Sequence, residues 1–342
     1  MTGLDLPLIA VAVIAAAVLF YVLLDGFDLG VGILFPLARS PADRDTMMAS
    51  IAPYWDGNET WLVLGGAGLF AAFPDAYAIV MPAFYLPVMG MLMSLILRGV
   101  AFEFRLHGRA RGKRAWTIAF AAGSVGATVA QGLIVGGFVQ GVRVAHGAFA
   151  GGPFDWATPY SLLTAAGLLA GYALLGAAWL MAKTTDGLHG DARRWAGAAA
   201  LMVAVLLAVI SLATLGVDPR VAARWGLANG RIDLARLIPR LPIPALGAAG
   251  LALAIAGVRG RSHRLPFAGA LVLFLSGYLG LAASFFPAIV PFEVGFRDAA
   301  NTPGALALLL TGVAFLAPFI LGYTAFVYWL FRGKVASDAG YH

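Results

Sequence analysis

The sequence predicts an all-α polytopic membrane protein, and three observations indicate that class. First, 61% of the 342 residues are hydrophobic and only 12% are charged, whereas soluble domains carry about 25% charged residues. Second, the apolar residues form long unbroken runs without the alternation of a β-barrel strand. Third, the basic excess that gives a net charge of +6 falls mostly in short loops, as expected beside membrane helices. The composition excludes a soluble enzyme and a disordered chain, and it favours a membrane over nucleic acid as a partner.

Nine apolar segments are candidates for membrane spans, which take roughly 20 residues to cross a hydrocarbon core of about 30 Å. Charged residues or clusters of Gly and Pro separate them. In chain order, the predicted spans are 7–36, 51–73, 76–98, 116–141, 159–182, 196–216, 243–258, 266–290 and 304–331. The first is too long for the core of a signal peptide, so we interpret it as a retained helix. The seventh is the shortest, with Pro242 and Pro244 at its start.

The orientation follows from the Lys and Arg residues, which favour cytoplasmic loops. With the N-terminus outside, most of the 23 Lys and Arg residues fall in the inside loops. The exception is the loop at 217–242, which is rich in arginine and would lie outside. That loop is long enough to form its own surface structure and to dock on a partner. We therefore predict an N-out, C-in arrangement.

A weak internal repeat is suggested by the dipeptide Asp-Gly, which occurs at 25–26 and again at 186–187. Both copies lie near the inner end of a helix that runs from outside to inside. We interpret the chain as a single transmembrane domain, 1–342; parallel repeats over 7–141 and 159–290 are one explanation of the recurrence, although one dipeptide is poor evidence for them. Chance recurrence of one dipeptide is the alternative.

Four acidic residues lie inside predicted spans: Asp25 and Asp28 in the first, and Asp56 and Glu59 in the second. Each pair is spaced i, i+3, so its members share one face of a helix. Asp28 and Glu59 lie about eight residues, or ~12 Å, from the loop joining the two antiparallel helices, so all four reach a similar depth. An Asp at the bilayer centre costs roughly 2.5–3.5 kcal/mol. We therefore expect them to face protein or water, where clustered carboxyl groups suit proton uptake and release.

Helix capping is the alternative interpretation of these acids. If Ser50 is an N-cap with Pro53 in the first turn, Asp56 lies near the positive end of the helix dipole, which stabilises an anion without any function. The dipole argument reverses for Asp25 and Asp28, which lie toward a helix C-terminus. Function is therefore favoured for the pair in the first span.

Several neighbours can support the acids. Arg98, at the end of the third span, is either their counter-ion or a snorkelling anchor, and Glu103 follows in the same segment. Trp55 precedes Asp56, and an interfacial aromatic belt is its default explanation. Gly26 and Gly30 form a GxxxG spacing, which lets another helix approach closely beside the two aspartates of the first span.

The chain alone offers no recognisable site for a redox cofactor. Cysteine is absent, and no P-loop, CxxCH or strand-linked GxGxxG is present. The histidines fall in loops or at the terminus, where no partner helix supplies a second haem ligand. We therefore expect this chain to bind no haem, metal, flavin or nucleotide; its acids indicate proton conduction and not electron transfer. The five histidines are His107, His146, His189, His263 and His342.

Several motifs, together with the order of the nine spans, resemble subunit II of the cytochrome bd quinol oxidases over nearly the whole chain. They are DGFDLGVG at 25–32, SIAPYWDGNETWL at 50–62, RGVAFEFR at 98–105 and FVYWLFRGKV at 326–335. Two further stretches, QGLIVGGFVQG at 131–141 and FAGGPFDWATPYSLL at 149–163, look most like the cyanide-insensitive branch of the family. The family often has an acidic Trp-Asp-Ala segment before the last span, where this chain has Phe296, Arg297 and Asp298.

The resemblance implies a multi-pass subunit of a bacterial inner-membrane complex that oxidises quinol and reduces oxygen to water. It implies two four-helix bundles with 304–331 as a peripheral helix. Haem b and haem d would belong to a partner, subunit I; a small third subunit and membrane lipid are further partners. Subunit II would bind no haem, support subunit I and help conduct cytoplasmic protons to the oxygen-reduction site. Of the residues that match, the resemblance associates Asp25 and Asp56 with that route; Asp28, Glu59, Arg98 and Glu103 match motif positions without an assigned role.

Two other functions fit the same residues. A proton-coupled secondary transporter would also use intramembrane carboxyl groups and parallel repeats, but it would work without a haem-bearing partner. A purely structural scaffold would use the acids only for contact between subunits. A coloured hetero-complex on purification would favour the oxidase, and a colourless active homo-oligomer would favour the transporter.

Overall fold

The structure, a computed structural model, describes residues 4–107, 110–228, 230–260 and 262–335. The described part is almost entirely helical. Its α-helices are α1 Leu6–Leu34, α2 Pro41–Ile51, α3 Trp55–Ala72, α4 Pro74–Ala83, α5 Tyr85–His107, α6 Ala110–Gln140, α7 Pro159–Lys183, α8 Asp186–Leu215, α9 Pro219–Arg224, α10 Leu234–Leu237, α11 Pro242–Arg259, α12 Leu265–Phe285 and α13 Pro303–Leu330. Two 3₁₀ turns, η1 Phe35–Leu37 and η2 Ile238–Arg240, extend α1 and α10.

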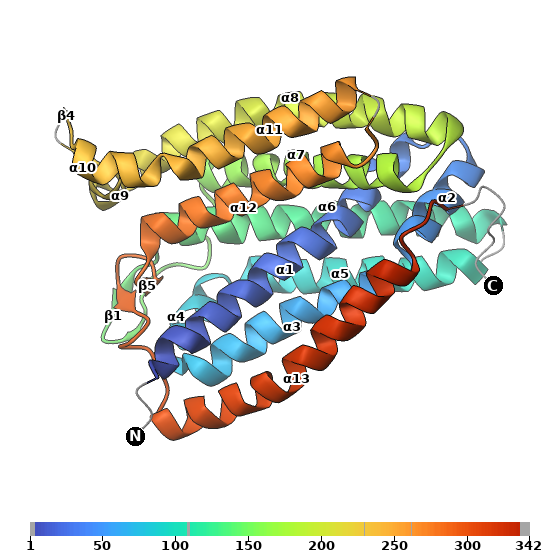
Figure 1. Cartoon of the computed structure of the whole chain (residues 1–342). Helices are drawn as coiled ribbons and strands as arrows, with labels where there is room; N and C mark the ends of the chain where they lie inside the picture. Colours follow the sequence, from blue (N-terminus) through green and yellow to red (C-terminus); the bar gives the residue numbers. More distant parts are fainter. Residues whose placement is uncertain (1–3, 108–109, 229, 261, 336–342) are drawn as a thin grey trace.

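Among the described residues, eight helices are long and apolar enough to cross a membrane. The predicted class, an all-α polytopic membrane protein, is therefore confirmed. The helix α3 is not among the eight because its first turns carry Asp56, Asn58 and Glu59, although it runs beside α1 in the bundle (Figure 1). The count of nine spans and the N-out, C-in orientation stay predictions.

The long helices form two groups that share a central contact (Figure 1). In the first group α1 packs on α3 and α6, and α5 packs on α6; in the second, α7, α8, α11 and α12 pack in a ring. Helices α1 and α6 of the first group both contact α7 of the second. The helix α13 lies along α1 and α3 at the edge, and only Leu306 of its residues is buried. The predicted two bundles with one peripheral helix agree with this arrangement, whereas the parallel repeats stay a prediction.

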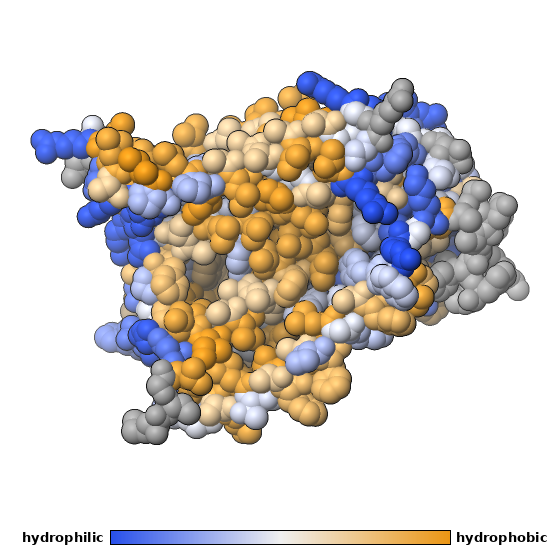
Figure 2. Space-filling view, viewed as in Figure 1, coloured by the Kyte–Doolittle hydropathy of each residue, from blue (hydrophilic) through white to orange (hydrophobic). Residues whose placement is uncertain are grey.

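Apolar side chains cover the middle of the molecule, and polar ones gather at its two ends (Figure 2). In the same view α1 begins at one end and α13 ends at the other (Figure 1). This distribution matches a helix bundle whose middle lies in the hydrocarbon core of a membrane and whose ends lie in the head-group layers. Many large apolar side chains are exposed on the long helices, including Val63 and Phe70 of α3 and Leu212 of α8.

Four of the long or amphipathic helices, α1, α2, α7 and α13, begin at side-chain N-caps, and one predicted N-cap is wrong. Thr158 accepts a hydrogen bond from the backbone N–H of Ser161 at the start of α7, with Pro159 as the first helical residue. Ser50, predicted as the N-cap of the second span, instead lies inside α2 and donates to the carbonyl of Met47 at 2.7 Å. A turn at 52–54 separates the two helices, so α3 begins only at Trp55.

The predicted third span, 76–98, is divided between two helices. The short α4 begins at Pro74 and ends at Ala83, and α5 begins at Tyr85 and continues to His107. Prolines explain the break. Pro82 lacks the N–H that an α-helix needs in its interior, whereas Pro87 lies in the first turn of α5, where no such donor is required. The predicted eighth span is also too long, because Ala288–Val290 at its end form strand β5.

Short two-stranded hairpins close three loops at one end of the molecule. Antiparallel pairs join β1 Val144–Ala145 to β2 Ala148–Phe149, β3 Leu227–Ala228 to β4 Arg231–Ile232, and β5 to β6 Val294–Gly295. The arginine-rich loop at 217–242 contains α9, the β3–β4 hairpin, α10 and η2. It therefore forms a surface structure of its own, as the sequence predicts; its docking on a partner stays a prediction.

The contact between α1 and α7 depends on glycine. A Cβ built on Gly30 would overlap the backbone carbonyl of Tyr172 and lie 2.8 Å from the backbone nitrogen of Gly176. A Cβ on Gly26 would lie 2.7 Å from the Tyr172 ring. The two helices thus meet backbone to backbone, which only glycine allows. This contact places the first-span aspartates in the centre of the molecule.

Candidate functional site

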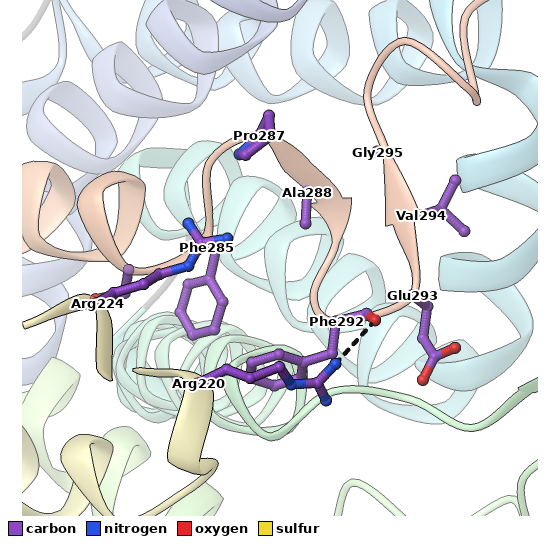
Figure 3. A pocket seen from close by; sticks show the side chains of 10 residues that line it. Arg220, Arg224, Phe285, Pro287, Ala288, Phe292, Glu293, Val294 and Gly295 are labelled. Atoms are coloured by element: carbon purple, nitrogen blue, oxygen red, sulfur yellow. Dashed lines mark hydrogen bonds between the residues drawn. The ribbon is translucent and has the colours of Figure 1, made fainter. Parts of the chain in front are cut away.

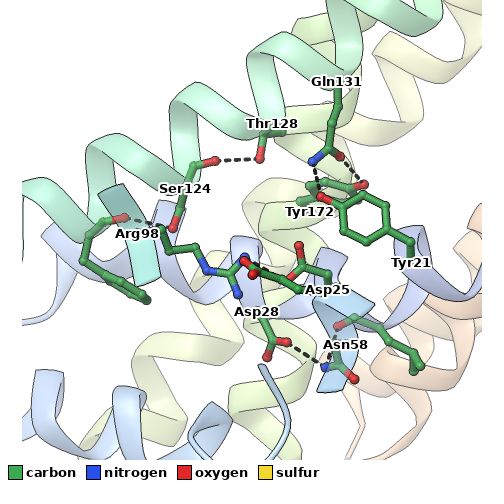
Figure 4. A network of polar contacts seen from close by, with 12 residues as sticks. Tyr21, Asp25, Asp28, Asn58, Arg98, Ser124, Thr128, Gln131 and Tyr172 are labelled. Carbon is green, nitrogen blue, oxygen red and sulfur yellow. Dashed lines mark hydrogen bonds and ion pairs between the residues drawn. The ribbon is translucent and has the colours of Figure 1, made fainter. Parts of the chain in front are cut away.

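A buried ion pair joins α1 to α5. The Arg98 Nη1 atom lies 2.7 Å from Asp25 Oδ1 and 3.4 Å from Glu59 Oε1. Arg98 and Asp25 are 1% and 0% exposed, whereas the side chain of Glu59 is 27% exposed. Figure 4 shows the guanidinium reaching from α5 toward the aspartates of α1. One arginine thus holds two carboxyl groups from two other helices.

The second aspartate of α1 has a neutral partner. Asn58 Nδ2 donates to Asp28 Oδ2 at 2.7 Å and to the Leu24 carbonyl at 3.2 Å. The Tyr328 hydroxyl on α13 in turn donates to Asn58 Oδ1 at 3.0 Å. A hydrogen-bonded chain therefore runs from the peripheral helix to Asp28, which is fully buried.

Four atoms of this network are buried without a hydrogen-bond partner among the described residues: Asp25 Oδ2, Asp28 Oδ1, Glu59 Oε1 and Arg98 Nη2. Buried polar atoms almost always bind protein or ordered water. Their gathering in one region of the bundle makes it the candidate functional site.

A second polar chain lies beside the first. Gln131 of α6 donates to the Tyr21 hydroxyl at 2.7 Å and accepts from the Tyr172 hydroxyl at 2.8 Å. Tyr21 precedes Asp25 by one helical turn, so this chain lies next to the ion pair (Figure 4). It joins α1, α6 and α7 through uncharged groups.

The structure brings together five of the seven residues that the sequence singles out. Asp25, Asp28, Glu59 and Arg98 form the network, and the Trp55 ring centroid lies 5.9 Å from the guanidinium of Arg98. The ring of Trp55 also packs on Phe102 at 5.1 Å. The other two lie apart: Asp56 is exposed on the first turn of α3, and Glu103 is exposed on α5.

Sequence reasoning missed the neutral members of the site: Asn58, Tyr328, Tyr21, Gln131 and Tyr172. Asn58 carried a weak signal because it lies between Asp56 and Glu59, and Gln131 because it interrupts an apolar run. The tyrosines carried none, since tyrosine is common in membrane helices.

Two arginines of the loop at 217–242, both on α9, bind the segment that carries the β5–β6 hairpin (Figure 3). A hollow of about 230 Å³ lies between α9 and the β5–β6 hairpin. Arg220 donates to the Phe292 carbonyl at 3.3 Å, and its guanidinium carbon lies 4.3 Å from the ring centroid of Phe292. Arg224 donates to the carbonyl of Phe286. The bidentate pairing with Arg220 lowers the pKa of Asp218. These arginines serve the loop structure and not the buried network.

Metal ligation finds no support among the described residues, where no three His, Asp or Glu side chains gather in a way that could hold an ion. His189 and His263 contact each other edge to face, with ring centroids 4.6 Å apart. Two haem ligands would need to lie on opposite faces of an iron. This histidine pair therefore does not fit a haem between its rings.

Fold and site together define a class: multi-pass helical membrane proteins with ionisable groups buried at membrane depth, which mark a functional site. A model of the family "Cytochrome bd terminal oxidase subunit II" matches residues 6–331. The chain therefore belongs to the cytochrome bd terminal oxidase subunit II family. It is a subunit of a terminal oxidase, an oxidoreductase complex, and a multi-pass protein of the bacterial inner membrane. This membership does not favour the transporter alternative.

Curated relatives and a solved structure agree with the family. The chain is 29% identical to cytochrome bd-I ubiquinol oxidase subunit 2 of Escherichia coli (strain K12), with 92% of this chain and 91% of the relative covered. It is 26% identical to cytochrome bd ubiquinol oxidase subunit 2 of Bacillus subtilis (strain 168), with 97% and 96% covered. A chain of the bd oxidase from Geobacillus thermodenitrificans superposes with a TM-score of 0.72 at 12% identity, covering 97% of this chain and 99% of the other, which shows a common fold.

Proposed function

We propose that this chain is the haem-free subunit II of a quinol:oxygen oxidoreductase and that it helps conduct cytoplasmic protons to the oxygen-reduction site of subunit I. The observation that supports this function best is the buried network of Asp25, Arg98, Glu59 and Asp28. Reduction of oxygen to water consumes protons, which need a protonatable route through the apolar bundle. Quinol is the substrate of the whole complex, as for the ubiquinol oxidase relatives.

The proposed route enters along α3. Asp56 is exposed, Glu59 one turn later is partly exposed, and Asp25 is fully buried beyond Arg98. Exposure thus decreases step by step along the acids. Arg98 contacts both Glu59 and Asp25, and the fully buried carboxyl group of Asp28 would hold a proton beyond them. Ordered water between these groups would complete the transfer.

The partner would cover the face of α3 that carries these acids. Asp56 and Glu59 cannot face lipid cheaply, because an acid at membrane depth costs roughly 2.5–3.5 kcal/mol. The same face continues with the exposed apolar residues Val63 and Phe70. An apolar surface with acids at one end suits a helical partner better than lipid alone. We therefore propose that subunit I packs on α3, and that lipid covers helices such as α8.

The redox cofactors, haem b and haem d, are proposed to lie in subunit I, where they would carry electrons from quinol to oxygen. The described histidines of this chain support that assignment. His146 is in an exposed hairpin, and the rings of His189 and His263 contact each other edge to face, which leaves no room for a haem between them. A small third subunit and membership of the cyanide-insensitive branch stay predictions.

Neutralising the acids tests the route. Asp28→Asn keeps an oxygen that can accept from Asn58 but removes the proton-holding carboxyl group, so oxygen reduction should slow by tenfold or more, on the scale of general acid–base contributions of about 10²–10⁴. Asp25→Asn and Asp56→Asn should slow it as well. The measurement is quinol-dependent oxygen consumption per haem in the purified complex.

Asp75→Asn serves as the matched control, because Asp75 is an exposed acid on α4 at the opposite end of α3. It should retain the wild-type rate. Wild-type rates in assembled Asp25→Asn, Asp28→Asn and Asp56→Asn complexes would remove the acids from the mechanism and leave only a scaffold.

A cross-linking experiment tests the partner face. The chain has no cysteine, so Asp56→Cys introduces a single thiol to which a photoactivatable benzophenone can be attached. Irradiation of the assembled complex should link this position to subunit I. The same label on Leu212→Cys, on the exposed face of α8, should react with lipid only. Efficient linkage from Leu212→Cys with none from Asp56→Cys would place subunit I against α8 and would contradict the proposed contact with α3.

A further inference from the structure

Lys183 is a buried cation that the proposed proton route does not use. It is the last residue of α7 and is 6% exposed. A buried ammonium group is costly unless all its N–H donors find acceptors. The groups that accept its N–H donors therefore indicate the role of Lys183.

The hydrogen-bond acceptors of the Lys183 ammonium group lie at the end of α13 and in the turn before α3. The ammonium group donates to the Tyr54 hydroxyl at 2.9 Å, to the Gly333 carbonyl at 3.3 Å and to the Phe331 carbonyl. Tyr54 itself donates to the Phe331 carbonyl at 2.8 Å. Phe331 is the C-cap of α13, and the last carbonyls of a helix have no partner within the helix. A cation there also complements the negative end of the helix dipole.

Aromatic rings surround the same ammonium group. Lys183 Nζ lies 4.8 Å from the Trp179 ring centroid and 5.2 Å from that of Tyr54, distances that give cation–π attraction. The Tyr54 ring packs on the Tyr328 ring of α13 at 4.6 Å. The packing around Lys183 therefore continues directly to Tyr328, the residue that donates to Asn58.

Besides its contacts with Lys183 and Tyr54, this end of α13 packs on the core through Val327 and Tyr328, and the Tyr328 ring also contacts Phe27 and Trp179. Only Leu306, near its opposite end, is buried. Beyond the helix, Val335 N donates to the Lys183 carbonyl at 2.8 Å. Lys183 and Tyr54 bind the carbonyl of Phe331 at the end of this helix, about one turn beyond Tyr328, which lies over Asn58.

We propose that Lys183 and Tyr54 form a clasp on the end of α13 that positions Tyr328, and through it Asn58, against Asp28. Lys183 is then a positioning residue and not a proton carrier. The kinetic part of this inference rests on the proposed proton route, whereas the clasp itself does not.

Hydrogen–deuterium exchange of the assembled complex tests the clasp alone. Lys183→Met keeps an unbranched side chain but removes the donors, so amide exchange in 326–335 should become faster. Lys334→Met is the matched control, because Lys334 donates to the Thr184 carbonyl at 3.2 Å, outside the α13 cap; its effect should be smaller. Unchanged exchange in Lys183→Met overturns the clasp.

Kinetics test the positioning role. Lys183→Met should lower the turnover by about tenfold, the equivalent of one hydrogen bond lost from the route, and should raise the solvent deuterium isotope effect. Combined with Tyr328→Phe, the loss should not exceed that of the slower single variant, because both act through Asn58. Lys183→Arg should recover part of the rate.

Multiplying losses in the double variant, or an unchanged isotope effect, would overturn the positioning role. Where Lys183→Met does not assemble, Tyr54→Phe removes only the hydroxyl between the ammonium group and Phe331 and must give the same pattern. If Asp28→Asn turns over normally while exchange in Lys183→Met is faster, the proton route fails and the clasp stands.

Discussion

Replacing Arg98 with methionine is expected to prevent the subunit from accumulating in the membrane. Arg98 is 1% exposed and provides the counter-charge of Asp25, which is 0% exposed. Removing one partner of a buried ion pair leaves the other charge unpaired, at a cost of about 3–5 kcal/mol. That is a large share of a folding stability of about 5–15 kcal/mol. The amount of subunit and of assembled complex in membranes, measured by immunoblot and native electrophoresis, checks this result.

A second substitution separates loss of charge balance from loss of packing. Combining Arg98→Met with Asp25→Asn removes both charges, so assembly should recover relative to Arg98→Met alone. Arg98→Lys, which keeps the positive charge but replaces the guanidinium with a compact ammonium group on a shorter side chain, should give an intermediate level. An Arg98→Met complex that assembles normally, or a double variant no better than the single one, contradicts the assigned role of the ion pair.

Most of the fold could be predicted from the sequence because membrane helices are set by local composition. Long apolar runs such as 159–182 and 304–331 correspond to helices α7 and α13 within one residue at each end. The errors occur where a proline or a turn interrupts a helix that the apolar pattern alone would continue. Pro82 ended α4 inside the third predicted span, and the turn at 52–54 moved the start of α3 to Trp55.

The charged members of the site could also be predicted, but their partners could not. Spacing alone placed Asp25 and Asp28 on one helix face, yet each binds a different group: Arg98 for the first and Asn58 for the second. An intramembrane charge is rare enough to attract notice in a sequence. Asn58 and Tyr328 are ordinary by composition, and only the tertiary packing of α13 on α3 brings them together.

Asp56 illustrates the limit of spacing arguments. It shares a helix face with Glu59 in the sequence, but because α3 begins at Trp55, Asp56 lies in the first turn and is exposed. Its environment is decided by whatever covers α3 in the complex. The proposed partner surface over Asp56 belongs to another chain, and the cross-linking experiment at Asp56→Cys identifies it.

Replacing Gly30 with alanine should have an effect as large as the loss of Arg98, although it adds only one methyl group. The added Cβ would overlap the Tyr172 carbonyl and lie 2.8 Å from the Gly176 nitrogen, so backbone and not a flexible side chain blocks it. Helices α1 and α7 must then separate, and the cost should exceed the 1–3 kcal/mol typical of overpacking. Gly277→Ala on α12 is the matched control, because a Cβ there meets nothing within 4 Å. We expect Gly30→Ala to lose the assembled complex on native gels and Gly277→Ala to retain it; equal assembly of the two variants would show that α1 and α7 do not meet as closely as described.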